Sequence, residues 1–110
     1  MKLYKYLALV KLGAPVSGTS VSPPLCETDC RVAVRAHHHE THRSKIFSAL
    51  VSTTHGEPLR ASDHSIELTM TVLGDDACDY FEAGDIFAIW RGQDIGRGVI
   101  CRRLLLWADS

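Results

Sequence analysis

The sequence lacks the motifs that mark most enzyme classes. No Gly-x-x-x-x-Gly-Lys-Ser/Thr phosphate loop occurs, so no motif is present for holding a nucleoside triphosphate. Nucleophilic catalysis needs a serine or cysteine next to a general base, and a third side chain that orients the base. The sequence contains no local signature of such a triad. We therefore expect a protein that is not an enzyme.

Net charge, cysteine and long apolar runs are also scarce. The formal net charge is -1 over 110 residues, which gives no overall electrostatic reason to bind nucleic acid or an anionic membrane. The four cysteines form no dense disulfide framework, which favours a reduced, cytoplasmic protein. No run approaches the ~20 apolar residues of a membrane span. Lys5 and Lys11 interrupt or end the N-terminal apolar run, so we expect neither membrane binding nor a signal peptide.

Short apolar runs separated by polar loops predict an all-β protein. In Ser65–Leu73, alternate residues are apolar and the residues between them are mostly polar, the pattern of a half-buried strand. Six strand-like runs are expected, namely Leu3–Leu12, Arg31–Ala36, Ile46–Val51, Ser65–Leu73, Ile86–Trp90 and Val99–Trp107. With no convincing long helix, we predict one domain over 1–110, a single antiparallel β-barrel of about six strands. Its body is 31–107, and 1–24 is a first strand plus loop or an extra N-terminal arm.

The segment 81–107 organises the rest of the chain as a strand, a glycine-rich turn and a second strand. We expect the turn to extend from Gly92 to Gly98, because glycine adopts the positive φ values that other residues avoid. Cys101 falls within the apolar run that follows the turn, and we expect it in the core as a small apolar residue.

Part of this segment resembles the β-barrel domains of translation elongation factor Tu. The resemblance is carried by Gly84 and Asp85, by Phe87–Ile89, and by Gly92 and Gly96–Val99. The strand-like segments Lys45–Thr54 and Ser65–Leu73 are also similar to the preceding strands of that family, and the resemblance is closer to the C-terminal barrel than to the middle barrel. It covers 31–106 and implies a stand-alone barrel without the GTPase. Barrels of that family contact tRNA and other proteins through surface loops. The matching positions are mostly glycine and apolar, so the resemblance implies a fold rather than a reaction.

A basic and aromatic set of side chains is the first candidate site. Arginines near a tryptophan can anchor a protein partner or stack on bases, although tryptophans in strands also serve as packing. The set comprises Trp90, Arg91, Arg97, Arg102 and Arg103. We expect a non-catalytic binding module of the elongation factor Tu barrel type that recognises a protein partner through loops and arginines. An RNA-binding protein associated with translation is the alternative.

A histidine-rich segment at 37–43 is the second candidate site. Neutral imidazoles and thiolates bind zinc, and the candidate ligands are His37, His39, His42, Cys26 and Cys30. The cysteine spacing is permitted, but the histidine spacing matches no standard zinc finger, and a solvated polar loop is the other interpretation. Zinc is thus the one cofactor that the pattern allows, and a metal-binding protein is the second alternative function.

Overall fold

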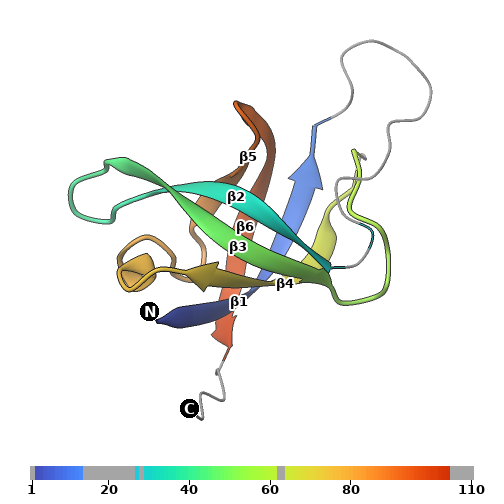
Figure 1. Cartoon of the computed structure of the whole chain (residues 1–110), viewed down its shortest axis with the longest axis horizontal. Coiled ribbons are helices and arrows are strands. Elements are labelled where there is room, and N and C mark those ends of the chain that lie inside the picture. The colour runs from blue at the N-terminus through green and yellow to red at the C-terminus, as the bar shows by residue number, and fades with distance from the viewer. Residues whose placement is uncertain (1, 14–26, 28, 62–63, 105–110) are drawn as a thin grey trace.

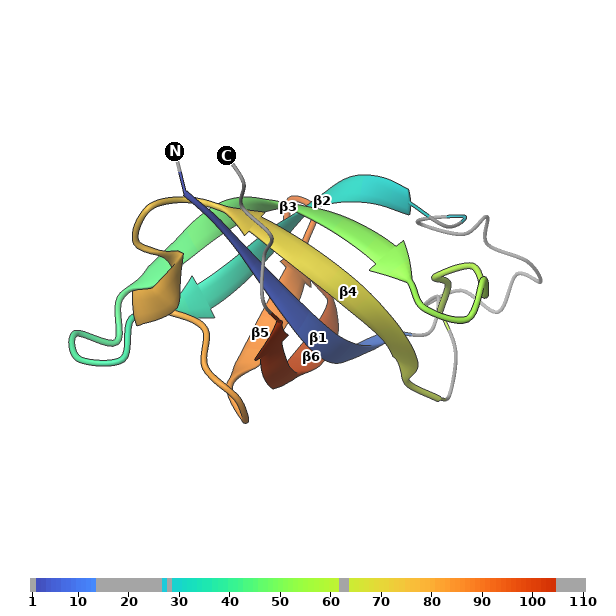
Figure 2. The same cartoon turned by 90° about the horizontal axis from the view of Figure 1, so that it is seen from below.

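The computed structural model describes residues 2–13, 27, 29–61 and 64–104. They form a closed antiparallel β-barrel with the strand order β1-β4-β3-β2-β5-β6 (Figures 1 and 2). Its strands are β1 (Leu3–Leu12), β2 (Asp29–His37), β3 (Ser44–Thr53), β4 (Ile66–Leu73), β5 (Ile86–Trp90) and β6 (Asp94–Leu104). One 3-10 turn, η1 (Ala77–Asp79), precedes β5 in the described chain. The prediction of an all-β, six-stranded antiparallel barrel is confirmed.

The first strand belongs to the barrel and is not a separate arm. β1 pairs with β4 on one side and with β6 on the other, so it closes the barrel. Residues 14–26, the remainder of the predicted N-terminal arm or loop, lie outside the described residues. In the part of the chain that is described, no helix is long and apolar enough to cross a membrane.

Alternation along each strand builds the core. The predicted apolar face of β4 is buried throughout, with Leu68, Met70 and Val72 fully buried and Ile66 at 3% exposure. On β1, the residues from Tyr4 to Leu12 that face the same way are likewise buried. Successive side chains of a strand point to opposite faces, so the residues between them lie on the outer surface of the barrel.

The turn in the C-terminal hairpin is shorter than we predicted. β6 begins at Asp94, so the turn consists of Arg91–Gln93, and Gly92 takes its positive φ of 74°. Gly96 and Gly98 lie within the strand and do not have positive φ. They are required for space, because a Cβ atom on Gly96 would lie 2.9 Å from the backbone carbonyl oxygen of Lys11. Residues 105–107 of the predicted last strand lie outside the described residues.

A β-bulge exposes Cys101, which we expected in the core. Leu7 pairs with Arg102, whereas the next residue of β1, Ala8, pairs with Ile100. Cys101 is therefore an extra residue on β6, and the bulge turns its side chain out to solvent.

The shortest strand pairing in the barrel is the one between β2 and β5. This ladder contains three residue pairs, Ala33–Trp90, Val34–Ile89 and Arg35–Ala88, whereas β2 pairs with β3 along its whole length. An ion pair reinforces the junction, because the Arg35 guanidinium donates to both carboxylate oxygens of Asp94, at 3.1 and 2.5 Å. This hydrogen bonding holds the pKa of Asp94 below its ordinary value. The first residue of β6 is thereby fixed against β2.

Candidate functional site

The five residues of the predicted binding surface do not form one patch. Trp90 and Arg91 lie at the end of β5, and Arg97 lies near the start of β6. Arg102 and Arg103 lie beyond the bulge, near the other end of β6. The Arg103 guanidinium lies 4.9 Å from the centre of the Tyr4 ring, so it covers that aromatic ring. The set therefore divides into separate surfaces.

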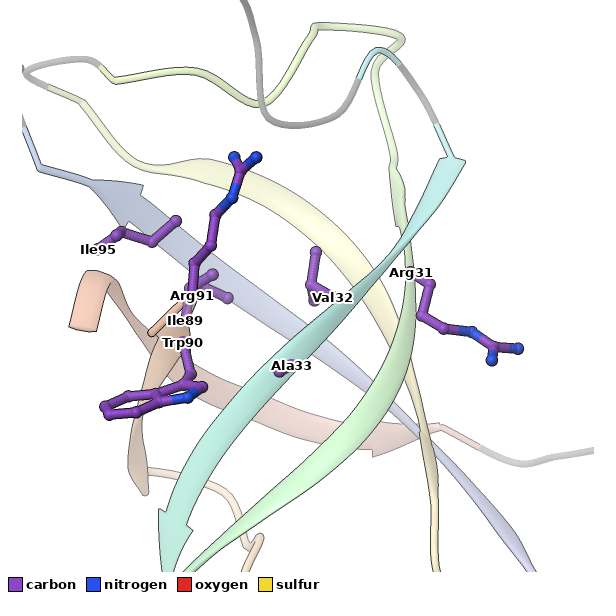
Figure 3. A pocket seen from close by; sticks show the side chains of 7 residues that line it. All are labelled: Arg31, Val32, Ala33, Ile89, Trp90, Arg91 and Ile95. Carbon is purple, nitrogen blue, oxygen red and sulfur yellow. The ribbon is translucent and has the colours of Figure 1, made fainter. Parts of the chain in front are cut away.

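A pocket of about 330 Å³ opens beside Trp90, where β2 and β5 diverge (Figure 3). β2 contributes residues 31–33 to its lining, and the hairpin contributes 89–91 and Ile95. Trp90 is half-buried, and Arg31 and Arg91 are exposed. Figure 3 shows the Arg31 side chain pointing away from Trp90 and Arg91. The two guanidinium groups therefore point in different directions from this pocket, which we call the β2–β5 wedge.

A second surface lies on the outer face of β1, β6 and β5. Leu9 pairs with Val99, and Val99 pairs with Ile86, so these three side chains form a row across three strands. We call this the apolar row. Ile86 is 63% exposed and Leu9 is 37% exposed, so the row presents aliphatic side chains of neighbouring strands to solvent.

Positive charge lies on both sides of the apolar row. Lys11 and Arg97 form the neighbouring cross-strand pair, and Arg102 lies beyond Val99 on the other side. None of these three cations forms an ion pair with the described residues. Glu67, which pairs with Leu9 from β4, already accepts a hydrogen bond from Thr54 Oγ1 at 2.7 Å. The sequence identified the arginines but missed the apolar row.

The histidine-rich loop packs against the loop that precedes β5. His39 Nε2 lies 2.6 Å from Asp85 Oδ2, and the His39 backbone N–H donates to the Asp79 carbonyl at 3.0 Å. The His37 ring lies between the Arg35 guanidinium, at 3.3 Å, and the carbonyl of His42, at 3.4 Å. Together with Tyr80 and Ile86, these loops line an open pocket of about 240 Å³.

The predicted zinc ligands are not gathered into one centre by the described chain. Zinc takes an unprotonated ring nitrogen, but the Nε2 atom of His37 faces a guanidinium and that of His39 faces a carboxylate. No three histidine, cysteine, aspartate or glutamate side chains among the described residues could hold a metal ion. Cys30 is disulfide-bonded, so its sulfur is not a thiolate and the expectation of reduced cysteines does not hold for it. Cys26 lies outside the described residues.

The contact between His39 and Asp85 predicts a pH-dependent stability. The hydrogen bond to Asp85 raises the pKa of His39 above its ordinary value of 6.5, because it favours the charged imidazolium. Because the pKa of His39 is higher in the folded protein than in the unfolded chain, the contact stabilises the folded state. This stabilisation is fully present below pH 6.5 and is lost as the pH rises through the pKa of His39 in the folded protein. We expect His39→Gln to lower the melting temperature at acidic pH more than at alkaline pH.

A matched control separates this contact from general loop effects. His42→Asn keeps a residue that tolerates the positive φ of 62° at this position, and it leaves the Asp85 contact in place. The melting temperatures of both variants and the parent protein are measured across the acidic and alkaline range. An equal loss for His39→Gln at both ends of the range would contradict the assignment.

The comparisons with known proteins leave the function to be argued from these surfaces. The six-stranded antiparallel barrel is compatible with a small barrel domain, and the resemblance to elongation factor Tu depends on sequence positions within 31–106. No protein-family model matches the chain, and no curated protein matches its sequence.

Proposed function

We propose that the chain is a non-catalytic binding module that recognises a protein partner through the outer face of β1, β6 and β5. The observation that carries this proposal is the apolar row, with Ile86 exposed at its end and, on both sides, cations that form no ion pair with the described residues. Apolar anchors surrounded by arginine are typical of protein interfaces. We also infer that the barrel is of the elongation factor Tu type, which the strand number and residues 84–99 support.

The chemistry of this face favours a protein over RNA. Fully burying an isoleucine side chain stabilises a complex by roughly 1.5–3 kcal/mol, and an apolar protein surface achieves this better than a phosphate backbone. RNA recognition uses aromatic side chains as stacking platforms, but the row consists of the aliphatic Leu9, Val99 and Ile86. The flanking cations then favour a partner with an acidic rim around an apolar patch.

Substitution within the row tests this proposal. Ile86→Ser removes the most exposed apolar anchor, and Arg97→Glu reverses the charge beside it. We expect each variant to weaken capture of protein partners from a native lysate about tenfold, equivalent to ~1.4 kcal/mol. Ile46→Ser is the matched control, since Ile46 is 47% exposed but lies on β3, outside this face.

The capture is run with and without RNase, and it has three distinct outcomes. Partners that survive RNase and are lost with Ile86→Ser support the proposal. Partners that disappear with RNase would replace it with RNA binding, for which affinity falls steeply with salt. Equal capture by all three variants and the parent protein would show that this face is not the interface.

A further inference from the structure

The pocket of about 240 Å³ beside the histidine-rich loop lies at one end of the apolar row. The histidine-rich loop and η1 are at the same end of the barrel (Figures 1 and 2). Ile86 is the last residue of the row, and it also lines this pocket together with Tyr80 and Asp85. We call it the histidine pocket. Because the row and the pocket share a side chain, one segment of a partner can contact both.

The histidine pocket opens where β2 and β5 separate. The last pair of their ladder is Arg35 with Ala88, so the same register would place His37 beside Ile86. That pair is not formed, and the two residues pair instead with Ser44 of β3 and Val99 of β6. His37 and Ile86 therefore lie on either side of an opening in the sheet, and both line the pocket.

Hydrogen bonds hold the histidine side of the pocket in one arrangement. His38 Nδ1 accepts hydrogen bonds from the backbone N–H groups of Glu40, at 3.1 Å, and Thr41, at 3.2 Å. The His38 ring also packs edge-on against Tyr80, with the ring centres 5.1 Å apart. These walls are formed before any ligand binds, which lowers the cost of ordering them on binding.

Carboxylates surround the pocket. Asp85 lines it with a side chain that is 33% exposed, and its Oδ2 atom accepts from His39 and from the Glu82 backbone N–H, at 2.8 Å. Within the described chain, these bonds use only one of its two carboxylate oxygens. Asp79 and Glu82 lie within electrostatic range of His39. Both are exposed, and neither forms an ion pair with the described residues.

Two cations contact the lining of the pocket, and each is already paired. The Arg35 guanidinium is bound to Asp94, and the Lys45 ammonium is bound to Asp76. Their charges are therefore compensated, whereas the carboxylates around the pocket outnumber the cations left to balance them. A pocket of this charge favours a cationic ligand.

We propose that the histidine pocket receives a lysine or arginine side chain of the protein partner that covers the apolar row. The apolar stem of that side chain packs against Ile86 and Tyr80, and its charged end reaches Asp85 Oδ1. Because Lys11 and Arg97 flank the row itself, the partner segment has acidic side chains along the row and a basic one at the Ile86 end. This inference rests on the proposed function and specifies the charge pattern of the partner.

A random peptide library displayed on phage is the probe, with the whole chain as bait. We expect enrichment of peptides that combine apolar and acidic residues with a lysine or arginine. Peptides that Ile86→Ser weakens are retained, and their affinities are measured by fluorescence anisotropy. Asp85→Asn should weaken binding at least fivefold, since it removes the charge but keeps an oxygen that can accept from the Glu82 N–H.

Glu40→Gln is the matched control. It removes one negative charge from an exposed residue of the histidine-rich loop that does not line the pocket. We expect it to change the affinity less than twofold.

A change in the peptide provides the same test without altering the fold of the protein. Acetylation of the lysine, or replacement of the arginine by citrulline, removes the charge at nearly constant length. Either change should weaken binding to the parent protein at least fivefold. In the Asp85→Asn background the same change should have little further effect, because the charge that it would lose contact with is already absent.

The outcomes separate this inference from the proposed function. Binding that is lost with Ile86→Ser but is unchanged by Asp85→Asn and by acetylation would overturn the inference and leave the proposed face in place. Equal losses with Asp85→Asn and Glu40→Gln would also overturn it, because the general charge of the loop would then account for binding. Peptides that neither Ile86→Ser nor Arg97→Glu weakens would contradict both proposals.

Discussion

Replacing Leu68 with alanine is expected to lower the free energy of unfolding by about 2–5 kcal/mol. Leu68 is fully buried near the middle of the chain's most regular strand, between Ala8 of β1 and Thr53 of β3. Ala8 is itself fully buried and too small to fill the space that a truncated leucine leaves. Because both neighbouring strands are tied into a closed barrel, the walls cannot collapse onto the cavity.

The control for this prediction is the same substitution on the outer face. Leu50→Ala removes the same atoms from a leucine that is 44% exposed, so its cost should be within about 0.5 kcal/mol. Both free energies come from urea unfolding curves followed by circular dichroism. Similar losses for the two variants would mean that β4 does not direct Leu68 into the core.

Strand positions could be predicted from the sequence wherever the signal is local. The alternating pattern of β4 and the short apolar runs of β1 and β5 predict where these strands lie. The observed bounds of β1 and β5 are identical to the predicted ones. The prediction that Gly96 and Gly98 belong to the turn is wrong. A glycine indicates either a positive φ or a lack of space, and only the packed neighbours distinguish the two. The bulge at Cys101 depends on the register with β1, which is also not local.

The candidate site was harder to predict than the fold because it depends on register. Along a strand that rises ~3.3 Å per residue, Arg97 and Arg103 lie on the order of 20 Å apart, so their closeness in sequence does not make one patch. The apolar row requires Leu9 to align with Val99 and Ile86, and these residues come from three different strands. Likewise, the short ladder that opens the wedge follows from how β5 meets β2, and no composition signal marks it.

Replacing Gly98 with valine is expected to lower the free energy of unfolding about as much as replacing Leu68 with alanine. The cause is overpacking of the core rather than a cavity. A Cβ atom at this position would overlap Phe87 Cζ and lie 2.8 Å from Cε1 of the same ring. Phe87 is 2% exposed and packs edge-on against Phe81, so its ring can shift only if its neighbours in the core shift as well. Overpacking of this kind lowers the free energy of unfolding by about 1–3 kcal/mol. Because the close contact is with a rigid aromatic ring, we expect Gly98→Val to cost about 3 kcal/mol or more.

A double-mutant cycle with Phe87→Leu separates this overlap from backbone strain. If the ring causes the damage, Gly98→Val should cost much less in the Phe87→Leu background than in the parent protein, and the cycle should show a coupling of at least about 1 kcal/mol. Gly56→Val provides the contrast, because Gly56 has a φ of 74° and no atom near its Cβ position, so its cost should not depend on Phe87. If the Gly98→Val variant does not fold, the same cycle is measured with Gly98→Ala. Additive costs for Gly98 and Phe87 would show that the ring does not account for this glycine, and the backbone explanation would then have to be reconsidered.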